Sequence, residues 1–344
     1  SIFFLSACIG KNTINLLNYK YNCSQHNETA CARYLFLKSW TDINNESYTT
    51  NIDKQKWNYW SDRYLEQIQT KEDAYVAIQT MIASLDDMFT RFLTPDELVE
   101  QKMDISGKLS GIGVVISASE NGNIKVEDVI ENSPAERAGV LPGDLVITAG
   151  EDKESVVELG YYGAIDKIRG EIGTKAYFTV ARGDNYSEEI EFEVVRERVQ
   201  AVSVMHHVYA LDSTVGVIKI TEFDIPTCEQ FIEAVEDLQA QGCEKLVVDL
   251  RYNPGGELNS IVKTLDYIVP AGPIVHIIDA DGNEVKMYTS DDRELDMPMA
   301  VVVNGSTASA AELFTSTVRD YEKAVIVGTT TYGKGCVQTT IPLN

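Results

Sequence analysis

Residues 299–312 read MAVVVNGSTASAAE and join a run of apolar residues to the start of a helix. The run from Met299 to Val303 does not alternate with polar residues, which is typical of a strand buried on both faces in a parallel sheet. Residues 304–307 are turn formers, and Ala308 to Arg319 then follows helical spacing. The stretch predicts a strand, a turn and a helix, the repeating unit of an α/β fold.

The same alternation of strand and helix extends on both sides of this stretch. We expect strands at 215–220, 245–250, 274–278 and 324–327, helices at 228–240 and 258–268, and a hairpin turn at Asp281–Gly282. Apolar strands joined by helices imply a largely parallel sheet covered on both faces. We assign residues 199–344 to this α/β core and expect it to continue beyond Asn344.

Upstream, residues 105–198 have the character of a compact β-rich module. Strands are expected at 114–116, 124–126, 145–147, 177–180 and 190–195, separated by Gly, Pro and Asn-Gly. A short helix at Ala135 to Ala138 stops at Gly139. Residues 53–104 contain apolar positions at helical spacing, and Thr70 with Asp73 predicts a capping box there.

The first 52 residues are interpreted as a signal-like or irregular arm, because residues 10–52 are rich in Asn, Thr, Tyr and Ser without firm periodicity. Residues 1–8, SIFFLSAC, resemble the end of an export signal, and the last four resemble a lipoprotein box in which Cys8 is lipidated. The alternative to an export signal is that these first residues form an apolar helix or strand. The export interpretation predicts a protein of the periplasm or cell envelope, with Cys8 as its only membrane anchor.

Charge and composition exclude several classes of function. The net charge of -24 disfavours nucleic acid and anionic headgroups, because binding phosphates requires clustered Lys and Arg. The six cysteines and four histidines show no metal-ligand spacing, so no metal and no cofactor are expected. Cys23 and Cys31 could form a disulfide or remain two thiols. The sequence contains no run of about 20 apolar residues, which is the length that a membrane-spanning helix requires.

Two segments after buried strands could carry chemistry. Residues 249–256, DLRYNPGG, place Gly255 and Gly256 where backbone N–H groups could form an oxyanion hole, although a plain turn has the same pattern. Ser309 lies between alanines at a helix start, where the dipole and the Ala310 amide favour a developing negative charge. An ordinary helix start capped by Ser306 or Thr307 is the alternative.

A third segment, residues 332–338 with the sequence YGKGCVQ, supplies a candidate base. A nucleophilic serine needs a base, and no histidine stands in a comparable position. Lys334 between glycines after a buried strand could enter a dry cleft, where burial favours the uncharged amine. Gln338 could hold that amine by a hydrogen bond. A lone Gly-Lys-Gly is usually a solvated turn, so the case depends on the combination with Ser309 and the glycine loop.

Taken in order, these segments resemble the carboxy-terminal processing (tail-specific) protease family, PDZ-containing serine peptidases with a Ser/Lys dyad. The resemblance covers residues 55–344 and is carried by 85–87, 90–95, 110–113, 133–135, 138–139, 142–144, 169–170, 173–174, 249–256, 307–312 and 333–338. It implies a crotonase-like α/β protease core with an inserted PDZ domain and an N-terminal helical segment. The family's catalytic serine, lysine and supporting glutamine fall on Ser309, Lys334 and Gln338. The sequence departs from the family's pattern at Thr307, Ala311 and Cys336.

The resemblance also implies a substrate class. Ser110, Gly111, Ile112 and Gly113 would bind a terminal carboxylate through backbone amides, so the expected partners are proteins or peptides with free C-terminal tails. Arg169, late in the PDZ domain, is the candidate for coupling tail binding to catalysis. The segment expected beyond Asn344 would help close the sheet or form a homo-oligomer.

Two other classes remain as alternatives. One is a catalytically inactive PDZ adaptor that only binds peptides, but an inactive core would be expected to have lost Ser309 or Lys334, and both are present. The other is a crotonase-type acyl-CoA enzyme, which needs acidic groups near the oxyanion hole and has no use for a PDZ domain. The expected activity is therefore that of a serine endopeptidase.

Overall fold

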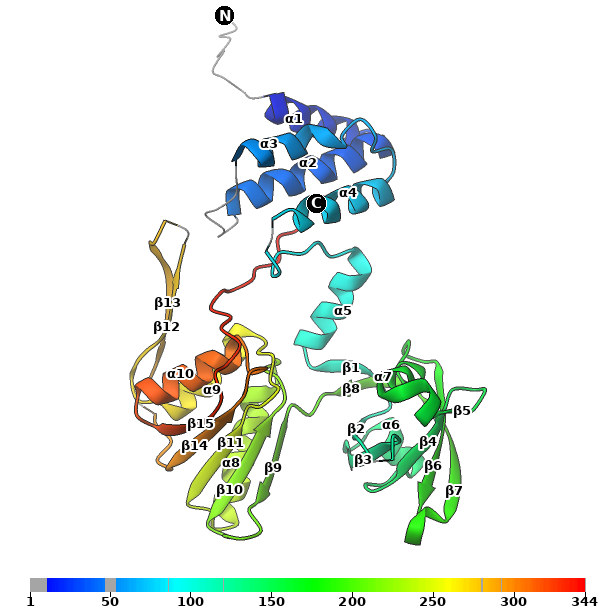
Figure 1. Cartoon of the computed structure of the whole chain (residues 1–344), viewed down its shortest axis with the longest axis vertical. Coiled ribbons are helices and arrows are strands. Elements are labelled where there is room, and N and C mark those ends of the chain that lie inside the picture. The colour runs from blue at the N-terminus through cyan, green and yellow to red at the C-terminus, as the bar shows by residue number, and fades with distance from the viewer. Residues whose placement is uncertain are drawn as a thin grey trace, which may run out of the picture. The chain divides into compact units, whose positions relative to one another are not determined.

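The computed structural model describes residues 11–46, 54–85, 87–119, 121–279, 281–291 and 293–343 (Figure 1). Cys8, the signal-like residues 1–8 and Asp86 lie outside them. The chain divides into two compact units. The first comprises Ser1–Val99, His276–Met287 and Cys336–Asn344, and the second comprises Glu100–Val275 and Tyr288–Gly335. Among the described residues, no helix has both the length and the apolar character needed to cross a membrane.

Helices dominate the N-terminal part of the chain. They are α1 (Lys11–Ser24), α2 (Glu28–Glu46), α3 (Lys54–Arg63), α4 (Lys71–Ala83) and α5 (Pro95–Ile105). The expected irregular arm is therefore wrong where α1 and α2 lie. Their Asn and Thr residues are weak helix formers, but Phe36 and Leu37 of α2 are buried in one core with Trp57, Ile78 and Met81. Packing of such a face stabilises helices that local propensity does not predict.

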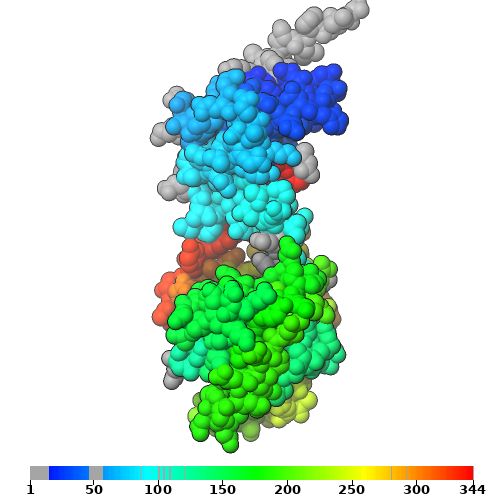
Figure 2. All heavy atoms as spheres, turned by 90° about the vertical axis from the view of Figure 1, so that its right-hand side faces the viewer, coloured from blue at the N-terminus to red at the C-terminus, as the bar shows by residue number. Residues whose placement is uncertain are grey.

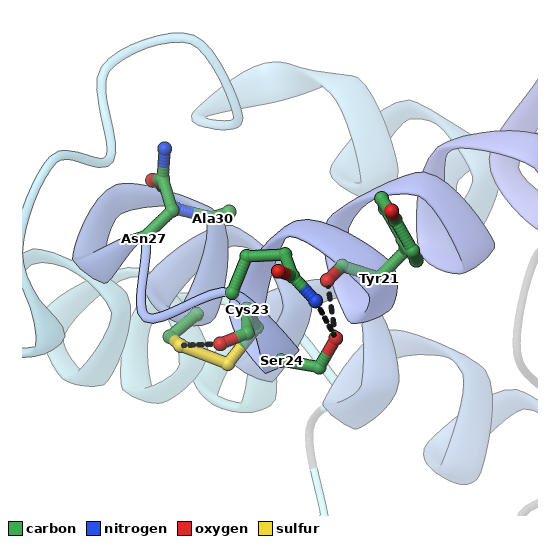
Figure 3. Close-up of a disulfide and its surroundings, with 7 residues drawn as sticks. Tyr21, Cys23, Ser24, Asn27 and Ala30 are labelled. Atoms are coloured by element: carbon green, nitrogen blue, oxygen red, sulfur yellow. Dashed lines mark hydrogen bonds between the residues drawn. A yellow bond between two sulfur atoms is a disulfide. The ribbon is translucent and has the colours of Figure 1, made fainter.

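A disulfide joins the end of α1 to the start of α2 (Figure 3). It links Cys23 to Cys31, which decides between the two alternatives left open by the sequence. Asn27 precedes α2, and its side-chain Oδ1 accepts a hydrogen bond from the Ala30 N–H at 2.8 Å, satisfying one of the free amides of that helix end. The capping box predicted at Thr70 of α4 is confirmed.

The β-rich module of the second unit, whose atoms are the teal and green spheres of Figure 2, contains the expected strands. One sheet has the order β2-β3-β4-β6-β7, with β5 paired to β4, and β1 pairs with β8 in a separate ribbon. The elements are β1 (Lys108–Gly111), β2 (Val114–Ala118), β3 (Ile124–Val129), α6 (Pro134–Ala138), β4 (Leu145–Ala149), β5 (Glu154–Ser155), α7 (Val156–Ile168), β6 (Lys175–Arg182), the 3-10 helix η1 (Asp184–Tyr186), β7 (Glu188–Val195) and β8 (Glu197–Gln200). Strand β2 forms one edge of its sheet.

Arg196, between β7 and β8, fixes the end of helix α7. It is only 8% exposed, and its guanidinium donates to the carbonyl oxygens of Lys167 and Ile168 at 2.8 Å each and of Lys175 at 2.6 Å. Burial lowers the pKa of Arg196. A cation against the last carbonyls of a helix satisfies free acceptors and complements the helix dipole. Arg196 was not among the residues predicted from sequence to have a role.

The α/β core has the strand order β15-β14-β11-β10-β9 (Figure 1). Strands β10, β11, β14 and β15 are parallel and β9 is antiparallel, so the largely parallel sheet is confirmed. The elements are β9 (Val204–Val208), β10 (Val215–Ile220), α8 (Thr227–Ala240), β11 (Lys245–Asp249), α9 (Leu258–Ile268), β12 (Gly272–Ile278), β13 (Glu284–Ser290), β14 (Met299–Val303), α10 (Ala310–Asp320) and β15 (Ala324–Gly328).

The expectation that helices cover both faces of this sheet is wrong. Helix α9 packs between α8 and α10, so the three helices lie side by side on one face. The parallel strands follow one another across the sheet in chain order, and right-handed connections that all advance in one direction place their helices on the same side. On the opposite face, Val325 and Val327 of β15 are 69% and 51% exposed.

Candidate active site

Three loops meet at the carboxyl ends of the parallel strands, where ligands collect in open α/β sheets. The loop after β14 contacts the loop after β11 through the Ala308 N–H, which donates to the Asn253 carbonyl at 2.9 Å. It contacts the segment after β15 through its Thr307 carbonyl, which accepts from the Tyr332 N–H at 2.9 Å. The buried Thr307 hydroxyl donates to the Leu250 carbonyl at 2.8 Å. The structure thus brings together the three segments predicted from sequence.

Ser309 lies at a strained point of the backbone. It has φ 54° and ψ -116°, directly before the first residue of α10. A positive φ is unfavourable for residues other than glycine, and a cost of roughly 1–3 kcal/mol persists only where the surroundings hold it. A serine on a sharp strand-to-helix turn presents its hydroxyl outward, which is the geometry of known nucleophilic serines. Ser309 is itself the N-cap, rather than Ser306 or Thr307.

Gly255 and Gly256 are glycines because the chain passes too close for a side chain. A Cβ on Gly255, where φ is +102°, would lie 2.7 Å from the Ser309 Cβ and 2.8 Å from the Ala310 nitrogen. A Cβ on Gly256 would lie 2.0 Å from the Phe223 carbonyl oxygen. The Gly255 N–H is already used, since it donates to Asn253 Oδ1 at 2.8 Å. Within the described residues, the N–H groups of Gly256 and Ala310 donate to no protein acceptor.

Glu312, in the first turn of α10, links the serine to the lysine segment. Its Oε2 accepts hydrogen bonds from the Ser309 N–H at 2.9 Å and from the Lys334 N–H at 2.8 Å. Its Oε1 accepts from the Gly333 N–H at 2.6 Å and from the Thr331 hydroxyl at 2.7 Å. One carboxylate therefore sets the backbone positions of both predicted catalytic residues.

The environment of Glu312 keeps it ionised. Burial raises the pKa of its carboxyl, but the hydrogen bonds from Thr331, Gly333, Ser309 and Lys334 outweigh that effect and lower the pKa below the ordinary value. Glu312 was not among the site residues predicted from sequence. The serine and the glutamate three residues later have the spacing of a capping box, which is the signal that could have identified it.

Similarity to known proteins covers the part of the chain that contains these three loops. Residues 214–344, which contain the three loops, match peptidase family S41. These residues carry a peptidase S41 domain. The resemblance expected from the sequence is confirmed, and the chain carries a peptidase domain.

Relatives extend the match over most of the chain. A carboxyl-terminal-processing protease of Synechocystis is 29% identical over 318 residues, covering 90% of this chain and 73% of that protein. A probable CtpA-like serine protease of Staphylococcus aureus is 34% identical over 313 residues, covering 89% of this chain and 61% of that protein. Among solved structures, a photosystem II D1 C-terminal processing protease matches with a TM-score of 0.54 and 27% identity, covering 90% of this chain and 83% of that one.

In this S41 domain, a charged pair supports the glycine loop. Arg251 donates to the Asp249 carboxylate through Nε at 2.9 Å, Nη2 at 2.7 Å and its N–H at 3.0 Å. Burial raises the pKa of Asp249, but the bonds from Arg251 lower it more, so the net shift is downward. Asn253, which is fully buried, donates its side-chain amide to the Ile220 carbonyl at 2.9 Å. These contacts fix the loop on which the oxyanion glycines lie.

The residues predicted to bind a terminal carboxylate, 110–113, comprise the end of strand β1 and the turn that leads to β2. The Ser110 hydroxyl donates to the Gly170 carbonyl at 2.5 Å. The carbonyls of Ile112 and Gly113 accept hydrogen bonds from helix α6 and from the end of β3, respectively, through Ala135 at 2.7 Å and Ile130 at 3.0 Å. Their carbonyls therefore point into the module and are fixed there. Gly111 ends strand β1, and Gly113 has φ +85°.

Gln338 and Arg169 are the remaining predicted site residues. Gln338 belongs to the first unit, where its side-chain amide donates to the Phe89 carbonyl at 2.6 Å. Its bond to Lys334 stays a prediction. Arg169 is exposed and forms the C-cap of α7, with its N–H donating to the Ile165 carbonyl at 2.8 Å. Its coupling role also stays a prediction.

Proposed function

We propose that the chain is a serine endopeptidase that binds the free C-terminal tail of a protein substrate and cleaves it with a dyad of Ser309 and Lys334. The observation that carries the proposal is the Glu312 carboxylate, which hydrogen-bonds the backbone of both residues. Peptidase family S41 and the protease relatives support the same reaction.

Each residue has a role in acyl transfer. The Ser309 hydroxyl attacks the scissile carbonyl carbon, and the Lys334 amine acts as the general base that takes the hydroxyl proton and later gives it to the leaving amine. The N–H groups of Gly256 and Ala310 bind the developing oxyanion, assisted by the N-terminus of α10. Gly255 has no side chain and so leaves room for Ser309, and Gln338 holds the Lys334 amine by a hydrogen bond. Water then releases the acyl group from Ser309.

The β-rich module supplies tail recognition in this proposal, as a PDZ domain of residues 105–198. Strand β2 is an edge strand, so an extended peptide could add to it as a further strand. The amides of Gly111, Ile112 and Gly113 would bind the terminal carboxylate, and Arg169 would couple that event to the crotonase-like core.

An exported location fits the N-terminal part of the chain. The Cys23–Cys31 disulfide is typical of proteins in oxidising compartments, because cytosolic thiols are kept reduced. We propose the periplasm or cell envelope as the site of action.

Amidating the substrate tail should slow cleavage. We expect an unstructured peptide with an apolar free C-terminus to have a kcat/KM about 10-fold or more above that of its C-terminal amide, because charged hydrogen bonds of about 1.5–3 kcal/mol are lost. Gly111→Trp should remove the difference by blocking the loop. The measurement is product formation by mass spectrometry. Equal cleavage of acid and amide by the unmodified protein would overturn tail recognition and leave the peptidase activity in place.

A further inference from the structure

Tyr252 combines backbone strain with an exposed aromatic side chain in the glycine loop of the active site. Its φ is +66°, in the left-handed region, and its side chain is 74% exposed. Gly, Asn or Asp adopts this conformation at little cost, whereas a bulky residue is a genuine outlier there. An aromatic ring in water contributes little packing that would compensate for the strain. Uncompensated strain of this kind clusters at functional sites.

The surroundings hold the backbone of Tyr252 on both sides. Its N–H donates to Asn304 Oδ1 at 3.1 Å, in the loop that leads to Ser309. Arg251 before it is tied to Asp249, and Asn253 after it is fully buried and accepts from the Ala308 N–H. The exposed ring is therefore carried by a fixed backbone position in the loop after β11, which contacts the loop after β14 and lies three residues before Gly255.

We infer that the Tyr252 ring forms a wall of the substrate-binding surface and selects an aromatic or large aliphatic side chain next to the scissile bond. This inference rests on the proposed peptidase function and adds its side-chain preference. An apolar side chain that packs on the ring removes both surfaces from water, and an aromatic one gains a further edge or offset-stacking contact. The strain at Tyr252 is then the cost of presenting a ring where glycine would otherwise suffice.

The test compares two exposed tyrosines that both have a positive φ. Tyr186, in the 3-10 helix of the β-rich module, has φ +54° and is 47% exposed. Tyr252→Asn and Tyr186→Asn each keep a residue that tolerates positive φ and remove a ring. For peptides that differ only in Phe or Ala beside the scissile bond, Tyr252→Asn should lower the Phe/Ala ratio of kcat/KM about 10-fold. Tyr186→Asn should leave the ratio unchanged, and Tyr252→Phe should preserve it.

A binding measurement separates this inference from the proposed function. The same Phe and Ala peptides are titrated into Ser309→Ala with and without Tyr252→Asn, and the loss of Phe preference should appear in the dissociation constants. If Tyr252→Asn leaves the preference for the Phe peptide unchanged in both binding and cleavage, the role of Tyr252 is overturned. The proposed dyad then still stands, provided that Ser309→Ala is inert. Cleavage by Ser309→Ala at the unmodified rate would instead overturn the proposed dyad, and the binding ratio would still decide on Tyr252.

Discussion

Replacing Lys334 by Ala should lower kcat/KM for an unstructured tailed peptide by about 10⁴-fold, with the fold intact. The side chain is the only proposed base for Ser309, whereas the Lys334 backbone keeps its N–H bond to Glu312 Oε2 whatever the side chain. The lysine segment should therefore stay in place and the effect should fall on kcat. Rates come from mass-spectrometric progress curves, and folding from circular dichroism.

Two further variants make that result specific. Lys334→Arg should also be inactive, because a guanidinium does not lose its proton near neutral pH and cannot act as a base. Lys245→Ala, an exposed lysine at the start of β11, should retain the unmodified rate. Activity in Lys334→Arg close to that of the unmodified protein would show that the amine is not the base.

Replacing Glu312 by Gln should reduce kcat about 100-fold, although the residue never touches the substrate. The carboxylate accepts from Ser309 and Lys334 through Oε2, and the substitution turns one oxygen into a donor that faces N–H groups. Losing hydrogen bonds to a charged acceptor costs about 1.5–3 kcal/mol each, and about 2.7 kcal/mol of lost alignment corresponds to 100-fold. Glu233→Gln, an exposed glutamate on α8, is the matched control and should change nothing.

The pH dependence of stability distinguishes this positioning role from a simple packing defect. Because the pKa of Glu312 is lowered in the folded protein, its contribution is fully present above the unfolded value of about 4.3 and is lost as the pH falls through the folded value. The unmodified protein should exceed Glu312→Gln in unfolding free energy by a constant margin above about pH 5. The margin should shrink below about pH 4. A margin that stays the same down to pH 3 in denaturant titrations would contradict the charged hydrogen-bond network.

Much of the core could be predicted from sequence because its signals are local. Each buried strand, such as Met299 to Val303, is a continuous apolar run, and the turn and helix after it have their own residue preferences. Ser309 and Gly255 were predicted from the combination of three segments that follow buried strands and from the resemblance of those segments to a protease family. The structure explains Gly255 directly, since no side chain fits against Ser309.

The features that sequence reasoning missed depend on partners distant in the chain. Helix α2 has weak local propensity and is stabilised by Phe36 packing against α4 residues such as Ile78. The single helical layer follows from strand order, which no local pattern encodes. Glu312 accepts its hydrogen bonds only where residues 331–334 return to α10, and the N–H of the strained Tyr252 is held by Asn304, 52 residues away in the chain.

The central claim is that Ser309 is the nucleophile of a peptidase, and one comparison tests it most directly. The unmodified protein and Ser309→Ala are purified and incubated with the same unstructured peptide that has an apolar free C-terminus, and the products are identified by mass spectrometry. If Ser309 is the nucleophile, the unmodified protein should cleave the peptide internally and Ser309→Ala should not, with identical circular dichroism. Cleavage by Ser309→Ala at the unmodified rate would contradict it.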